Sequence, residues 1–328
     1  MAGYISRTNE FAKELIEKDL ISSKKHNAIY DYFFQTTLRD APWYEWLDKP
    51  GYFEVANEYK ERIHEWIHEN EFNTVHGLDQ FKHRDLINGT TQAFDEAYYR
   101  YKDRNLRMLR GEYAYHKRVV TNYQYLDSVE QDNIELSQLD SDNPIKENDW
   151  VVISFPFCGN GGTPLGYRAI LDDCWRLKVP VLIDCAWYGT CMDQHIDLTH
   201  PAITEVCFSL TKGTGTGNIR SGVRYSNYED NLPIRQQNNY NHLVLGAAQV
   251  GIHIMKHIPS DWQVKNYRDL QVQLCRKLNI MPSPCMHIAM ADGEEEWHKD
   301  FLIDERYYKV GIRQALKALK KNELPEIK

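Results

Sequence analysis

Apolar side chains recur at helical spacing in the first part of the chain. Within Tyr52 to Asn70, Tyr59 and Ile63 are among the apolar residues that share one face of an expected helix. A second helical run is expected from Gly89 to Tyr101. We therefore interpret residues 1–75 as a helical segment that precedes the sheet-forming part of the chain.

The middle of the chain changes to short, continuous apolar runs. Such runs are typical of strands that are buried on both faces, and a helix is expected from Gly166 to Lys178, after the first of them. The pattern therefore predicts an α/β sheet that is covered on both faces. The expected strands are Trp150–Phe155, Val179–Ile183, Glu205–Ser209 and Gly222–Tyr225.

Beyond Asn231 the pattern is again mostly helical, which predicts a small helical C-terminal domain. A chain of 328 residues, of which 42% are hydrophobic, can bury one large core and a smaller one. We therefore expect three parts: the helical segment at 1–75, a large domain at 76–235 and a small domain at 236–328.

The composition excludes several classes of partner. A formal net charge of -8 argues against nucleic acid, because phosphate binding needs clustered Lys and Arg. No apolar run reaches the roughly 18 residues that a membrane helix needs, and the N-terminus has no signal-peptide core. Seven cysteines without a CxxC pair favour buried free thiols over disulfides or a metal site. We therefore expect a cytoplasmic protein without a membrane or nucleic-acid partner.

The glycine-rich segment from Ser209 to Gly222 is the strongest chemical signal. It follows an expected strand and contains Lys212 and Arg220. A lysine amine can form an imine with an aldehyde, and an arginine with nearby hydroxyls and backbone N–H groups can surround a phosphate. A solvated surface loop and a nucleotide-binding loop are the alternatives. The second is disfavoured because Gly213-x-Gly215-x-x-Asn218 lacks the last glycine of a dinucleotide fingerprint.

The spacing of Ser209, Lys212, Arg220 and Gly222 resembles the cofactor-lysine motif of the fold-type I pyridoxal-phosphate (PLP) enzymes, the aspartate aminotransferase superfamily. The resemblance implies that Lys212 is a catalytic lysine that carries PLP as a Schiff base. It also implies that Ser209 and Arg220 bind the cofactor phosphate. The likeness extends over roughly residues 80 to 225 and, more loosely, over the last hundred.

Further residues that follow expected strands match this family in chain order. Asp184 ends the run Val181–Ile183, and the resemblance implies that it pairs with the pyridine nitrogen during catalysis. Asn160 is implied to contact the phenolic oxygen of the cofactor. An ordinary turn residue is the alternative for both. Trp187 stands where the family usually has a Tyr for the same oxygen, and Tyr188 follows it, so either is a candidate.

The segment from Asn88 to Phe94 resembles a family segment in which a loop enters a helix. The resemblance implies that Gly89, Thr90 and Thr91 bind the phosphate, since a helix N-terminus offers free N–H groups. A plain threonine N-cap is the alternative.

One aromatic and one basic residue complete the expected site. Tyr113 resembles the residue whose ring stacks on the pyridine, with Tyr115 as the alternative and simple packing as a competitor for both. Arg313 resembles the arginine that binds the substrate carboxylate through two parallel hydrogen bonds. A surface arginine on a helix that runs to Lys320 is the alternative.

The resemblance implies a PLP-dependent transferase-like fold, with a mostly parallel sheet of about seven strands, helices on both faces and a small C-terminal domain. It implies a homodimeric aminotransferase that moves an amino group between an amino acid and a 2-oxo acid. Other PLP chemistry on an amino acid (decarboxylase, lyase or racemase) and a non-catalytic sensor with the same fold are the alternatives. The sequence does not separate the reactions, because one cofactor supports all of them.

Overall fold

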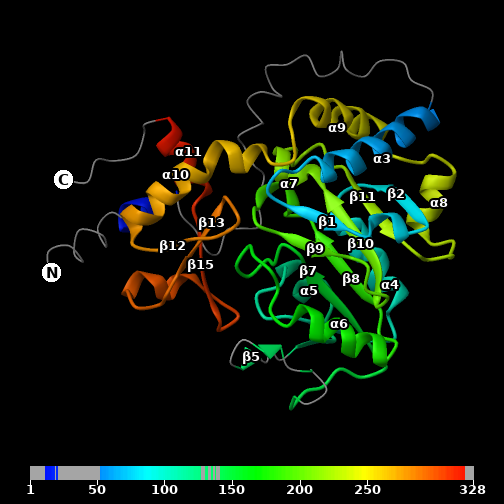
Figure 1. Cartoon of the computed structure of the whole chain (residues 1–328), viewed down its shortest axis with the longest axis horizontal. Helices are drawn as coiled ribbons and strands as arrows, with labels where there is room; N and C mark the ends of the chain where they lie inside the picture. Colours follow the sequence, from blue (N-terminus) through cyan, green and yellow to red (C-terminus); the bar gives the residue numbers. More distant parts are fainter. Residues whose placement is uncertain are drawn as a thin grey trace, which may run out of the picture.

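The protein consists of a large α/β domain and a smaller domain beside it, as Figure 1 shows for the computed structural model. Residues 1–11, 19 and 21–51 of the expected N-terminal helical segment lie outside the described part of the chain. The described residues are 12–18, 20, 52–126, 130–131, 134–135, 137 and 141–321.

A seven-stranded sheet forms the centre of the large domain. The strand β11 is antiparallel to both of its neighbours, and the other neighbouring pairs are parallel. The expectation of a mostly parallel, seven-stranded α/β sheet is therefore confirmed. In spatial order the strands are β2 (His83–Ile87), β11 (Gly222–Ser226), β10 (Ile203–Ser209), β8 (Val181–Cys185), β7 (Asp149–Ser154), β3 (Asn105–Met108) and β4 (Tyr123–Tyr125).

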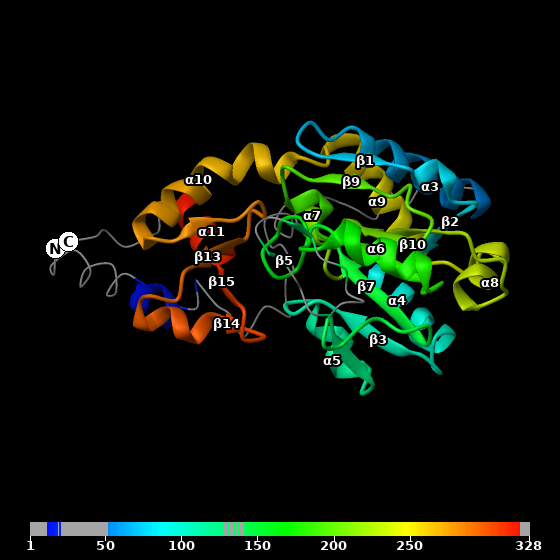
Figure 2. The same ribbon diagram turned by 60° about the horizontal axis from the view of Figure 1, so that its bottom comes forward.

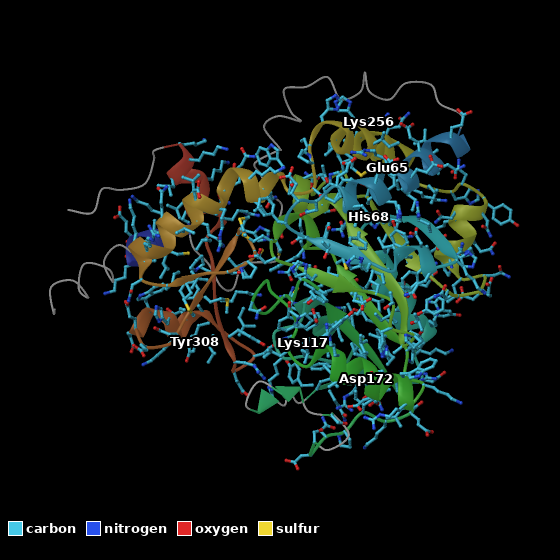
Figure 3. All side chains as sticks on the ribbon, in the orientation of Figure 1. Glu65, His68, Lys117, Asp172, Lys256 and Tyr308 are labelled. Atoms are coloured by element: carbon cyan, nitrogen blue, oxygen red, sulfur yellow. The ribbon has the colours of Figure 1, made fainter. Side chains whose placement is uncertain are left out.

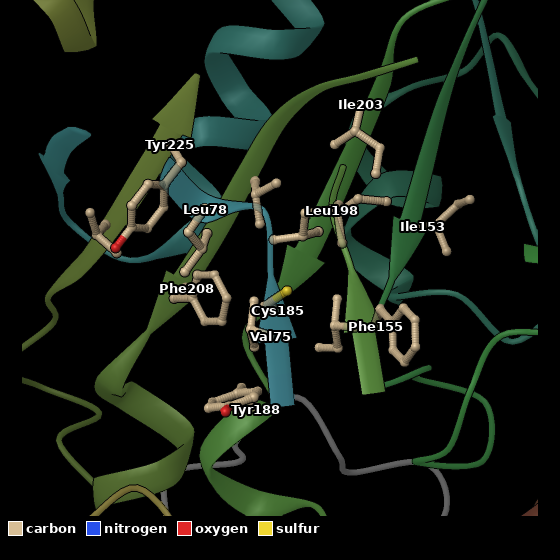
Figure 4. Close-up of a cluster of buried hydrophobic side chains, with 14 of the residues drawn as sticks. Val75, Leu78, Ile153, Phe155, Cys185, Tyr188, Leu198, Ile203, Phe208 and Tyr225 are labelled. Carbon is tan, nitrogen blue, oxygen red and sulfur yellow. The ribbon is translucent and has the colours of Figure 1, made fainter. Parts of the chain in front are cut away.

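Helices cover both faces of this sheet, because alternate residues of each strand point to opposite sides. On one face Val151 and Ile153 belong to a core that includes α3 (Tyr52–His68), α6 (Tyr167–Arg176) and α9 (Leu245–His257). Figure 4 shows part of this core, with Phe155 and Phe208 among its aromatic residues. On the other face Trp150, Val152 and Leu182 pack with α4 (Thr90–Arg100) and α8 (Pro233–Asn239).

The expected strands and helices of the large domain are present with small shifts of their ends. The four expected strands are β7, β8, β10 and β11, and the three expected helices are α3, α4 and α6. The sequence pattern missed β2, which reads His-Arg-Asp-Leu-Ile. Asp85 is buried because it lies opposite Arg224 of β11 in the pairing register and forms an ion pair with it.

The small domain contains a sheet, so the expectation of a helical small domain is wrong. The helices α10 (Trp262–Leu278) and α11 (Arg313–Lys320) pack with a four-stranded antiparallel sheet. Two of these strands have only two residues, which is too short to give an alternating pattern. The strands, in spatial order, are β12 (Met281–Pro282), β13 (Ile288–Ala291), β15 (Tyr307–Gly311) and β14 (Leu302–Ile303).

The packing of the ends of the chain differs from the division expected at residues 75 and 235. The helix α9 lies along α3 over the large sheet (Figure 2) and shares its core. A helical turn at residues 12–17 packs instead with the small domain, through Ala12 and Leu15. Hydrophobic contacts between distant segments therefore assign each part of the chain to a domain.

Backbone and charged contacts join the two domains. The N–H of Met286 donates to the carbonyl of Thr190 at 2.9 Å, and Met192 donates to Pro284 at 3.0 Å. Lys117 of α5 (Ala114–Val119) lies on the side of the large domain that faces the small domain (Figure 3), and its Nζ is 2.5 Å from Asp304. None of the described helices is both long enough and apolar enough to cross a membrane.

A cluster of buried charges holds β2, β10 and β11 to α4. The guanidinium of Arg224 is fully buried and lies 2.9 Å from Asp85 and 3.8 Å from Glu205. It also donates a short hydrogen bond to Glu96 of α4. Burial raises the pKa of Glu205 to about 7, although Arg224 and Arg100 lower it. Arg224 therefore compensates negative charge that no solvent reaches.

Replacing Arg224 with Met should destabilise the protein by about 3–5 kcal/mol, because it removes the buried cation that Asp85, Glu96 and Glu205 share. Chemical unfolding followed by circular dichroism measures the change. The control is Lys82→Ala, which removes an exposed pair with Glu229 and should leave the unfolding midpoint unchanged. Equal stability of wild type and Arg224→Met would show that the buried cluster contributes nothing to folding.

Candidate active site

The site lies at the edge of the large sheet where the parallel strands end. Because the carboxyl ends of parallel strands meet at one edge, loops that are far apart in sequence come together there. Arg220 lies at the same edge, because it precedes β11, and an antiparallel strand begins where its parallel neighbours end. Of the expected residues, Gly89 and Thr90 follow β2, Tyr113 follows β3, Asn160 follows β7, Asp184 lies in the end of β8, and Lys212 follows β10.

Lys212 lies between two aromatic rings. It is on the short helix α7 (Leu210–Thr214), and its Nζ is 4.9 Å from the ring centre of Tyr113 and 4.9 Å from that of Trp187. Tyr115 instead donates a hydrogen bond to Asp95 at 2.7 Å. Of the two tyrosines considered from the sequence, the structure therefore brings Tyr113 to the lysine.

The backbone of Lys212 is held from the small domain. The amide nitrogen of Gln263, on α10, donates to the carbonyls of Lys212 at 3.1 Å and Gly213 at 2.9 Å. Gly213 packs on Gly189, and a Cβ added to Gly213 would lie 3.3 Å from the Cα of Gly189. The absence of two side chains thus lets α7 approach the loop after β8 closely. The position of the amine depends on both domains.

Asp184 is a buried carboxylate beside this amine. It accepts hydrogen bonds from the N–H of Ala186 at 2.9 Å and from the hydroxyl of Thr90. Burial raises the pKa of Asp184 to about 6, whereas the charge of Lys212 and the two hydrogen bonds lower it. Asp184 is therefore ionised at neutral pH and can serve as the partner of a buried cation.

Arg220, Thr91 and Gly89 lie together at the start of α4. The guanidinium of Arg220 donates to the hydroxyl of Thr91 at 2.5 Å. Gly89 has a φ of 76°, and a Cβ placed on it would lie 2.8 Å from the guanidinium. No ion pair in the described part of the chain includes Arg220, so its charge is available to an anion. A cavity of about 430 Å³ borders Arg220 and Thr91, but its lining does not include Lys212 or Asp184.

The structure distinguishes Trp187 from Tyr188. The hydroxyl of Tyr188 donates to the carbonyl of Ile67 at 2.7 Å, within the core. Trp187 faces Lys212, and its buried indole N–H has no hydrogen-bond partner among the described residues. Trp187 is therefore the one of the two that can donate to a group bound at Lys212.

Ser209 and Asn160, which were expected to contact the cofactor, form hydrogen bonds with nearby residues of the chain. The hydroxyl of Ser209 accepts from the N–H of Thr211 at 3.2 Å and donates to the carbonyl of Ser221 at 3.4 Å. The side-chain oxygen of Asn160 accepts from the N–H of Gly162 at 2.9 Å. The roles of Ser209 and Asn160 toward a cofactor stay predictions.

Arg313 is the first residue of α11, beyond the end of β15, and its carboxylate-binding role stays a prediction.

The small domain also contributes a residue that the sequence analysis missed. Lys309, within β15, is buried, and its Nζ lies 5.7 Å from the ring centre of Trp187. No motif in the sequence singled out Lys309, which lies between two residues of the small-domain core, Tyr308 and Val310.

Solved structures share this fold, although no protein-family model matches the sequence and no curated protein is similar enough to match. An aminotransferase from Staphylococcus aureus is 14% identical, with a TM-score of 0.58 over 90% of this chain and 88% of that chain. The aromatic aminotransferase from Pyrococcus horikoshii OT3 is 13% identical, with a TM-score of 0.56 over 98% and 93%. The PLP-bound C-S lyase from Staphylococcus hominis is 13% identical, with a TM-score of 0.58 over 81% and 82%.

These likenesses show the fold. The chain has the architecture of the fold-type I PLP enzymes, so the fold expected from the glycine-rich motif is confirmed. The three solved structures are named for two different reactions, transamination and C–S bond cleavage. The shared architecture therefore does not select between them.

Replacing Asp184 with Asn should stabilise the cofactor-free protein at neutral pH. Burial raises the pKa of Asp184 from 3.8 to about 6, so folding favours the protonated acid. The folded protein therefore loses stability as the pH rises from about 4 to 6, by about 3 kcal/mol, and the loss is constant above that. The gain from Asn should be largest above pH 6 and nearly absent at pH 4, as measured by urea unfolding of both proteins.

The control for this experiment is Asp103→Asn, at an exposed aspartate, which should give no pH-dependent difference. If the stability difference between wild type and Asp184→Asn does not change with pH, burial does not raise the pKa of Asp184.

Proposed function

We propose that this protein is a PLP-dependent aminotransferase, which moves an amino group between an amino acid and a 2-oxo acid. The observation that carries the proposal is the position of the Lys212 amine. It lies between Tyr113 and Trp187, with the buried carboxylate of Asp184 beside it, at the carboxyl edge of a sheet with this fold.

The residues present fit the cofactor. Lys212 would hold it covalently, and Asp184 would hold a proton on its ring nitrogen. Arg220 and Thr91 would bind its phosphate, next to a glycine at which a Cβ would meet the guanidinium. The partnerless indole N–H of Trp187 would donate to its phenolic oxygen.

Residues of the chain have separate roles in the proposed reaction. The bound cofactor supplies a ring that accepts the electron pair released at the α-carbon of an amino acid. Once the amine of the substrate has displaced it, the freed Lys212 Nζ would take the α-proton and return a proton to the C4′ carbon of the cofactor. Asp184 would stay ionised, and the rings of Tyr113 and Trp187 would keep water from the amine.

We also propose a cytoplasmic homodimer, as the family resemblance implies. Elimination from an amino acid is the second candidate reaction, because a C-S lyase has the same fold with an equal TM-score. The two differ in their products. A transaminase gives one new amino acid for each 2-oxo acid consumed, whereas a lyase releases ammonia without a 2-oxo acid acceptor.

The purified protein should absorb visible light, and borohydride should fix the cofactor to Lys212. The reason is that Lys212 is the amine at the carboxyl edge of the sheet, in the position of the family's cofactor lysine. Mass spectrometry after reduction and digestion locates the adduct. The matched control is Lys212→Arg, which keeps the charge but should give no adduct. An adduct on another lysine, including Lys309, would contradict the proposal.

Asp184→Asn should lower kcat by roughly 100-fold or more while the cofactor stays bound, because a neutral amide cannot hold the ring nitrogen's proton. Rapid mixing with an excess of amino acid gives the rate at which the visible band disappears. Asp103→Asn is again the control, since that side chain is exposed on the large domain. An unchanged rate would show that Asp184 has only a structural role in the turn after β8.

A further inference from the structure

Lys309 is a second amine at the candidate site, and unlike Lys212 it is buried. It lies on β15 of the small domain, with 8% of its surface exposed. Its Nζ donates to the carbonyl of Cys158 at 2.9 Å, in the loop after β7 of the large domain. It lies 5.7 Å from the ring centre of Trp187, whereas Lys212 Nζ lies 4.9 Å from the same ring. Lysines from two domains thus flank one indole.

The alternation of β15 explains why this lysine points out of its own domain. Successive residues of a strand point to opposite faces. Tyr308 and Val310 belong to the core of the small domain. Tyr307 points the other way and meets Phe157 of the large domain, with ring centres 5.7 Å apart. Lys309 has the same parity as Tyr307 and therefore faces the large domain.

No carboxylate in the described part of the chain forms an ion pair with Lys309. Its only hydrogen bond there is the one to the neutral carbonyl of Cys158. The pKa of Lys309 is lowered chiefly by burial and also by repulsion from Lys212, while Cys158, Cys285 and Glu112 raise it. A buried ammonium without a counter-ion is unfavourable, and an anion that enters the site relieves this cost.

We propose that Lys309 binds the carboxylate of the amino-acid substrate, a role that rests on the proposed function. The amine of Lys212 is used to hold the cofactor, so Lys309 is the cation left beside Trp187. A substrate that reacts at Lys212 would place a carboxylate between the two domains. Lysine gives a single point charge, whereas an arginine would give a planar pair of hydrogen bonds.

The sequence resemblance gave this role to Arg313, and that expectation stays a prediction beside the proposal for Lys309. Arg313 begins α11, whereas Lys309 lies in β15, with its Nζ near the Trp187 ring and bonded to the carbonyl of Cys158. The two residues can be tested separately because they lie on different elements of the small domain.

The test uses the holoenzyme and unreactive acids that lack an amino group. Acetate, propanoate and 3-phenylpropanoate are titrated by calorimetry, with the three matching amides as uncharged controls. Lys309→Met should weaken the acids by roughly 10- to 100-fold and leave the amides unchanged. Lys309→Arg should restore most of the affinity, and Lys309→Gln provides a second neutral variant if Met disturbs folding. The exposed Lys299→Met should bind the acids as wild type does.

The pH dependence gives a second readout. Lys309 must be protonated to bind an anion, so the affinity of wild type should fall as the pH rises through its lowered pKa. Lys309→Arg should remove this decrease, because arginine stays charged. The groups that face Lys309 (Lys212, Glu112, Cys158 and Cys285) are the same in both proteins, so the comparison isolates the amine.

Three results would overturn the inference: equal binding of acids by wild type and Lys309→Met, equal losses for acids and amides, or a loss that follows Arg313→Met instead. These outcomes differ from failure of the proposed function. A colourless wild-type protein would reject the cofactor. A yellow Lys309→Met variant, with its borohydride adduct on Lys212 and normal acid affinity, would reject only the role of Lys309.

Discussion

The site depends on the attraction between the half-buried amine of Lys212 and the buried carboxylate of Asp184. Burial alone disfavours the charge of Asp184, and the amine, Thr90 and the N–H of Ala186 counteract it. This balance is possible because β8 and β10 are neighbouring parallel strands whose carboxyl ends lie side by side. The order of the strands therefore determines which charges meet.

The small domain completes the site and does not only cover it. Gln263 fixes the backbone of Lys212 and Gly213, and Lys309 adds a second positive charge beside Trp187. A change in the relative position of the domains would therefore move the lysine and its surroundings together. In the proposed aminotransferase, substrate binding and cofactor position are coupled through α10 and β15.

Much of the site could be predicted because its residues lie in short segments with distinctive composition. The run from Ser209 to Gly222 identified Lys212 and Arg220, and apolar runs placed Asp184 at the end of a strand. The strand β2 was missed because Asp85 and Arg84 hide its apolar character. The buried charge of Asp85 is compensated by Arg224, which lies opposite on β11, whereas Arg84 lies opposite Tyr225. Residues close together in the chain do not encode this pairing.

The sequence by itself determined the α/β class, the edge of the sheet where the candidate site lies and the chemical types of its principal groups. These follow from local periodicity and from residues close together in the chain. Only the tertiary structure decided that Trp187 rather than Tyr188 faces Lys212, and that Lys309 enters the site. The reason is that each choice depends on which face of an element is covered by a distant segment, and that is fixed by packing between domains.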